Sequence, residues 1–143
     1  MSQQIIEHEL TIRIEGAALP GTLSMPGDSS RPIGLVIFVH GSGSSRTSPR
    51  NRQVAHDLVA AKMASLLFDL LTPHEAADRR NVFDIGLLSR RVMEATQWMH
   101  NDPETMGLPV AYFGASTGAA AALVAAAELG QSIRAVVSRG GRP

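Results

Sequence analysis

The chain has 143 residues, the usual size of one domain, and 44% of them are hydrophobic, so it can bury a core. Thirteen basic residues balance thirteen acidic ones, and this neutrality argues against nucleic acid or an anionic membrane surface as a partner. The chain contains no cysteine, which excludes disulfides, thiolate metal sites and a cysteine nucleophile. We therefore expect one globular domain over residues 1–143.

The hydropathy pattern contains no membrane or export signal. No apolar run reaches the ~18 residues of a membrane span. The first ten residues, MSQQIIEHEL, lack the basic and then apolar pattern of a signal peptide. We expect a soluble cytoplasmic protein without a membrane partner.

The N-terminal residues predict a β-hairpin. Residues 5–14 alternate between apolar and polar side chains, as a half-buried strand does. Gly16 and the Pro20-Gly21 pair predict turns, and residues 22–25 predict a short returning strand.

In the rest of the chain, buried strands alternate with helices. Apolar runs predict strands over 33–39, 64–68, 110–113 and 133–137. Residues 49–63 and 119–129 predict helices, the second ended by Gly130. Between them, Asn81 is the expected cap of a helix with the apolar stripe Ile85, Leu88, Val92, Ala95 and Met99. Segments 70–80 and 103–109 are predicted loops.

This order predicts an α/β fold, a three-layer αβα sandwich with a mostly parallel sheet. Ligands of such sheets bind outside the carboxyl ends of the strands. Two loops of unusual composition, 41–46 and 114–118, are expected at that edge.

The second of these loops, Gly114-Ala-Ser116-Thr-Gly118, matches the G-x-S-x-G pattern of a nucleophile elbow. It lies where a predicted strand turns into a predicted helix, as such an elbow requires. Ser116 would stand at the helix N-terminus, whose free N–H groups favour developing negative charge. Ser116 is therefore the candidate nucleophile.

The first loop begins with His40-Gly-Ser42-Gly. In acyl-transfer enzymes with a nucleophile elbow, an N–H of this loop and the N–H after the nucleophile form the oxyanion hole. The expected donors are the backbone N–H groups of Ser42 and Thr117.

These motifs resemble the α/β-hydrolase superfamily, and more narrowly the dienelactone-hydrolase-like esterases. The resemblance is carried by LVIFVHGSGSSRTSPRNRQVAHDL, LLFDLLTP, RRNVFDIGLLSRRV and VAYFGASTGAAAALVAAA, and runs from about residue 10 to residue 143. It implies a truncated α/β-hydrolase fold that reaches the sixth strand. In that family the acid and the histidine follow later strands, so no residue here is carried over for either role.

The base that activates Ser116 must then come from elsewhere. The candidates at the same sheet edge are His40, directly before the loop over 41–46, and His74, in the loop after Asp69. Asp69 could orient an imidazole, and Arg46 and Arg139 could bind an anionic group. A partner subunit or solvent hydroxide is the alternative source of the base.

The pattern predicts neither a metal site nor a cofactor. No H-E-x-x-H or similar cluster is present. A dinucleotide loop over 41–46, with Asp69 as ribose ligand, is a weaker reading because Arg46 replaces the third glycine.

The leading hypothesis is a small serine hydrolase of activated esters or lactones, with phosphotriesters as a further class. The alternative is a catalytically inactive half-domain that only folds and assembles. Because the strand over 133–137 would leave an edge unpaired, with Arg134 as its charge, we also expect a homodimer or higher homo-oligomer.

Overall fold

The structure, a computed structural model, describes residues 4–28 and 30–140. One sheet has the strand order β1-β2-β4-β3-β5-β6. The strands are β1 (Ile5–Ile14), β2 (Ala17–Pro26), β3 (Leu35–Val39), β4 (Ala64–Phe68), β5 (Val110–Ala115) and β6 (Ile133–Arg139). The helices are α1 (Pro49–Ala60), α2 (Pro73–Ala76), α3 (Arg79–Val82), α4 (Ile85–Asn101) and α5 (Thr117–Leu129), followed by a 3₁₀ turn, Gly130–Ser132.

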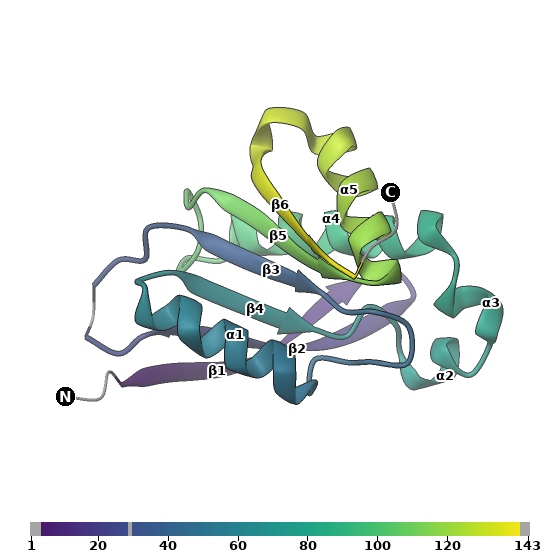
Figure 1. The fold of residues 1–143 in the computed structure, drawn as a ribbon, viewed down its shortest axis with the longest axis horizontal. Coiled ribbons are helices and arrows are strands. Elements are labelled where there is room, and N and C mark those ends of the chain that lie inside the picture. The colour runs from purple at the N-terminus through teal and green to yellow at the C-terminus, as the bar shows by residue number, and fades with distance from the viewer. Residues whose placement is uncertain (1–3, 29, 141–143) are drawn as a thin grey trace.

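The expected three layers are present. Strands β4, β3, β5 and β6 run parallel, and the β1–β2 hairpin joins them antiparallel through β2. Helix α1 covers one face of the sheet, while α4 and α5 lie on the other (Figure 1). This confirms the α/β sandwich with a mostly parallel sheet. No helix of the described segments has the length and apolar character needed to cross a bilayer.

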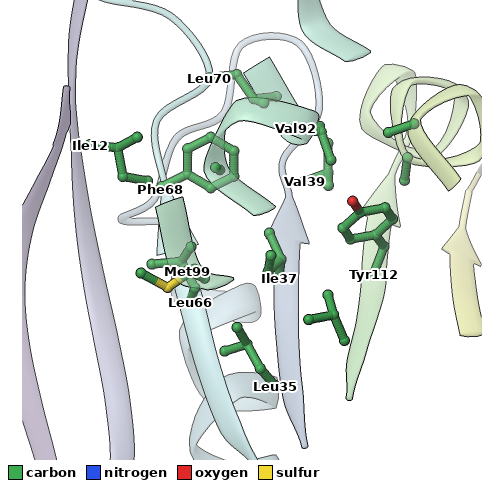
Figure 2. Packing of buried hydrophobic residues seen from close by; sticks show 14 of the residues in the cluster. Ile12, Leu35, Ile37, Val39, Leu66, Phe68, Leu70, Val92, Met99 and Tyr112 are labelled. Carbon is green, nitrogen blue, oxygen red and sulfur yellow. The ribbon is translucent and has the colours of Figure 1, made fainter. Parts of the chain in front are cut away.

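The main core lies between the sheet and α4 with α5. All residues of β3 and β4 are buried, and Figure 2 shows Phe68 and Tyr112 among the side chains of this cluster. The predicted stripe of α4 faces it, with Leu88, Val92, Ala95 and Met99 buried. Burial raises the pKa of Tyr112 to about 12, and its hydroxyl hydrogen-bonds Thr96 at 2.6 Å. A smaller cluster packs beneath α1.

The predicted turn at Pro20-Gly21 is wrong, because both residues lie inside the continuous strand β2. Pro20 pairs with Thr11 of β1. A Cβ at Gly21 would lie 3.2 Å from Leu10 Cδ1 and 3.3 Å from Leu67 O, so the glycine allows close strand packing. The predicted turn at Gly16 is confirmed: the hairpin turns at Glu15-Gly16, where Gly16 has φ +82°.

The segment expected to be a loop over 70–80 contains α2 and the first two residues of α3. The predicted cap of α4 by Asn81 is wrong as well. Asp84 is the cap, accepting from Leu87 N at 3.0 Å, whereas Asn81 lies in α3 and donates to Glu75 O at 2.9 Å. One-turn helices are too short to show a 3.6-residue period.

The remaining differences are shifts of element ends. Strand β3 begins at Leu35, and Ile33 is 67% exposed. Helix α1 ends at Ala60, and Lys62 adopts φ 73° in the turn that follows. Strands β5 and β6 each extend two residues past their predicted ends, to Ala115 and Arg139.

Candidate active site

Ser116 occupies the sharp turn between β5 and α5. Its backbone has φ 57° and ψ −123°, a left-handed conformation that costs a non-glycine residue on the order of 1–3 kcal/mol. Its N–H donates to Arg139 O at 3.0 Å, and its carbonyl accepts from Ala119 N at 3.0 Å. The residue is exposed and its side chain makes no cap hydrogen bond to α5. Ser116 therefore lies at the surface, and its side chain is not engaged in capping α5.

The two glycines of the motif are required by close backbone packing. A Cβ at Gly118 would lie 2.1 Å from Val39 O, at the end of β3. A Cβ at Gly114 would lie 2.7 Å from Ala119 Cα. Neither position accommodates a side chain, so the sequence pattern follows from the packing of α5 against β3 and β5.

The loop after β3, residues 41–46, is called the oxyanion loop below. A Cβ at Gly41 would lie 2.9 Å from Ala115 O and 3.0 Å from Ser116 Cβ, so the loop packs directly against the elbow. Ser44 N donates to Gly41 O at 3.1 Å, and Gly43 has φ +74°. The two loops that the sequence placed at one sheet edge are therefore in contact.

The two expected oxyanion donors lie close together. Thr117 is the first residue of α5, where a helix offers its N–H no intrahelical acceptor. The N–H of Ser42 donates to the side-chain Oγ1 of Thr117 at 2.9 Å. This hydrogen bond joins the oxyanion loop to the elbow.

His40 is held by backbone on both sides of its ring. Nε2 accepts from Leu70 N at 3.1 Å, so Nδ1 carries the proton and donates to Gly41 O at 2.9 Å. Burial lowers the pKa of His40, against the smaller raising effects of the Gly41 hydrogen bond and the charge of Asp69. As placed, the ring is neutral and has no nitrogen free for Ser116.

Two other predicted residues, Asp69 and His74, make no hydrogen bond with Ser116: Asp69 binds the loop over 41–46, and His74 is exposed to solvent. Asp69 does not orient an imidazole: its carboxylate accepts from Arg46 N at 2.7 Å and from Arg46 Nη1 at 2.8 Å. This fork fixes the far end of the oxyanion loop. His74 lies in α2 and is exposed. Within 4–28 and 30–140, no histidine hydrogen-bonds Ser116 Oγ.

A cavity of about 360 Å³, the first cavity, opens between the oxyanion loop and the α2–α3 segment. Ser42 and Thr117, the two residues expected to supply the oxyanion donors, line it. Its far walls are mostly apolar, formed by Leu70, Leu71, Pro73, Ala76, Val82 and Leu88. The first cavity therefore offers a mostly apolar surface beside Ser42 and Thr117.

An ion pair that the sequence analysis missed holds the wall of the first cavity. Arg91 of α4, 7% exposed, donates to Glu75 Oε1 at 2.9 Å, to its second carboxylate oxygen, and to Leu70 O at 3.2 Å. Arg91 lowers the pKa of Glu75 to about 2. Glu75 and Thr72 form a capping box, and the spacing Thr72-x-x-Glu75 was the sequence signal for it.

A second, open cavity of about 460 Å³ lies on the other side of the oxyanion loop. Ser116 lines it together with Arg50, Asn51 and Arg139. Arg139 was expected to be able to bind an anionic group; the sequence analysis did not single out Arg50 or Asn51. Of the two cavities, Ser116 therefore lines the second. No group of three metal-ligating side chains occurs among the described residues.

Comparison with solved structures shows which fold family the chain resembles. A crystal structure of a dienelactone hydrolase from Anabaena variabilis superposes with a TM-score of 0.91 and 50% identity, over 98% of this chain and 65% of that one. The chain has the fold of an N-terminal part of an α/β-hydrolase.

More distant α/β-hydrolase structures agree in fold alone. Est1E from Butyrivibrio proteoclasticus has a TM-score of 0.75 at 19% identity, over 90% of this chain and 48% of that one. A dienelactone hydrolase-like promiscuous phosphotriesterase from metagenomic libraries has 0.72 at 17%, over 96% of this chain and 59% of that one. No protein-family model matches the sequence.

The curated relatives carry a different name. Two Mycobacterium tuberculosis proteins, both named "putative phosphoribosyl transferase", are 54% identical over 137 residues, which is 96% of this chain and 30% of theirs. The chain thus spans less than a third of those proteins, and their name describes a much longer polypeptide. The α/β-hydrolase fold, by contrast, accounts for all the elements described here.

Proposed function

We propose that this chain carries the nucleophile and oxyanion hole of a serine hydrolase that acts on activated esters or lactones. The observation that carries the proposal is the backbone of Ser116, a positive φ at a strand–helix junction with an exposed hydroxyl. Backbone strain of this kind persists only where the surrounding structure enforces it, and it clusters at functional sites.

In the proposed reaction, Ser116 Oγ forms a bond to the substrate carbonyl carbon and the π electrons move to the carbonyl oxygen. The N–H groups of Ser42 and Thr117 would donate to that oxyanion. Collapse of the intermediate breaks the bond to the leaving oxygen and leaves an acyl ester on Ser116. Water then hydrolyses this ester and releases the acid.

The proton of the Ser116 hydroxyl needs an acceptor, and His40 and His74 are the proposed candidates. His40 would first have to break its bond with Leu70 N, and His74 would have to turn inward from solvent. A rate that levels off with rising pH and falls at least tenfold in H40A or H74A supports a histidine base. A rate that rises steadily with pH in all three proteins supports hydroxide instead.

The proposed substrates have a neutral, apolar acyl group, because the first cavity has mostly apolar walls beyond the two donors. Phosphotriesters are a second proposed class, since a P=O oxygen gains the same negative charge during attack. A structural relative is named for that activity.

We further propose that the chain associates with a second copy through β6 and α5. Strand β6 pairs with β5 on one side alone in the sheet. Val137 of β6 and Leu123 and Val124 of α5 are between 41% and 53% exposed. A two-fold axis would let this one surface serve both subunits.

Mass spectrometry after reaction with a fluorophosphonate probe tests the proposed nucleophile. We expect one adduct, on Ser116, and none in S116A, whose hydrolysis of a p-nitrophenyl ester should fall about 10²- to 10⁴-fold. S132A, in the exposed 3₁₀ turn, is the matched control and should react like the wild type. An unlabelled wild type would favour the alternative of an inactive half-domain.

A further inference from the structure

The hydrogen bond between Ser42 and Thr117 occupies one of the two donors of the proposed oxyanion hole. The Ser42 N–H points at Thr117 Oγ1 across 2.9 Å. A backbone N–H has one hydrogen and makes one well-aligned hydrogen bond at a time. While the Thr117 hydroxyl accepts it, a substrate oxygen cannot.

The Thr117 hydroxyl occupies the place that a substrate oxygen would take beside the Ser42 N–H. Both Ser42 and Thr117 line the first cavity, so the hydroxyl lies where an incoming carbonyl oxygen would approach the donor. The Thr117 N–H, at the first position of α5, is the other proposed donor. The same residue thus supplies one donor through its backbone and blocks the second through its side chain.

We infer that Thr117 closes the oxyanion hole in the free protein and opens it by rotation about its Cα–Cβ bond. This inference rests on the proposed function. Threonine has staggered χ1 rotamers, and Thr117 is only half-buried, so rotation moves Oγ1 off the Ser42 N–H without moving the backbone. Substrate binding then replaces the Thr117 hydroxyl by the carbonyl oxygen.

The cost of breaking the hydrogen bond between Ser42 N and Thr117 Oγ1 sets the expected change in labelling rate. Breaking one neutral hydrogen bond before the substrate oxygen can bind costs a factor of about two to ten in rate. T117A removes the acceptor and leaves both N–H groups in place. T117S keeps an acceptor at the same position, so comparing T117A with T117S isolates the loss of that acceptor.

The experiment measures the second-order rate of fluorophosphonate labelling at Ser116 for the wild type, T117A, T117S and S132A, with amide exchange of Ser42 followed by NMR. Closure by Thr117 predicts labelling about two- to tenfold faster in T117A than in T117S, wild-type labelling in S132A, and faster exchange of the Ser42 amide in T117A than in T117S. Thermal unfolding of each variant confirms that it is folded.

The contrary outcomes are distinct. Slower or unchanged labelling in T117A, with a labelled wild type, overturns the closure and shows that the hydrogen bond supports the loop or has no kinetic role. A Ser42 amide whose exchange is the same in T117A overturns the contact itself. A wild type that no probe labels overturns the proposed function, and the inference falls with it.

Discussion

The two flanks of the sheet are built differently. On the N-terminal flank the edge strand β1 carries Glu7, Glu9 and Arg13, and such charges discourage pairing with another strand. On the C-terminal flank β6 has Arg134 and Arg139, with only uncharged residues between them, and none of its residues is buried. All the ion pairs of the described residues involve residues up to 104. Among the described residues, the N-terminal edge strand therefore carries three charges, whereas β6 takes part in no ion pair.

The largest expected difference is in the cost of removing a leucine side chain from each flank. Leu23 of β2 is 1% exposed and Leu123 of α5 is 53% exposed. L23A should lower the free energy of unfolding by about 2–5 kcal/mol. L123A should change it by about 0.5 kcal/mol or less at high dilution. Urea unfolding measures both, and equal costs would remove the contrast between the flanks.

A smaller effect is expected from the Arg91–Glu75 ion pair. E75Q should lower the free energy of unfolding at pH 7 by about 1.5–3 kcal/mol, because Arg91 loses a charged partner. Folding lowers the pKa of Glu75 from 4.5 to about 2. The stabilisation is therefore present above pH 4.5 and is lost as the pH falls toward 2.

Unfolding of wild type and E75Q across this pH range checks the linkage. The difference in stability should be constant near neutrality and shrink in acid. E128Q, an exposed substitution in α5, is the control for the open flank and should follow the wild type. A difference between wild type and E75Q that is independent of pH would contradict the assignment.

The smallest effect on stability, but the sharpest test of the open edge, is expected from V137R. Val137 is 51% exposed on β6, and Ile6 is 43% exposed on β1. If β6 pairs with a second copy, V137R should halve the mass measured by light scattering, whereas I6R should leave it unchanged. A wild type that is a stable 15.2 kDa monomer would contradict the proposed association.

The sequence predicted the parts of the fold that depend on periodicity and steric exclusion. The buried strands and the stripe of α4 follow from hydrophobic patterns, and the elbow follows from glycines that leave no room for a Cβ. The same rules misassigned Pro20-Gly21, since a proline and a glycine also fit a strand at a close packing point. They missed α2 and α3, which are single turns.

The hydrogen-bond partners of the candidate residues could not be predicted from the sequence, and these partners determine what each residue can do. His40 lies at the predicted edge, yet its ring binds Leu70 and Gly41. Asp69 also lies there, yet it holds Arg46. Position along the chain selects the sheet edge. Only the fold determines which atom meets which, because Leu70 is thirty residues beyond His40.

The hydrogen bond from Ser116 N to Arg139 O connects the strained turn to the strand at the open edge. Edge strands separate from their sheets more readily than central ones, through local opening that leaves the rest of the structure intact. Each such opening of β6 removes this restraint from the elbow. The time that Ser116 keeps its positive φ is thus tied to how long the last residue of β6, Arg139, stays in register with β5.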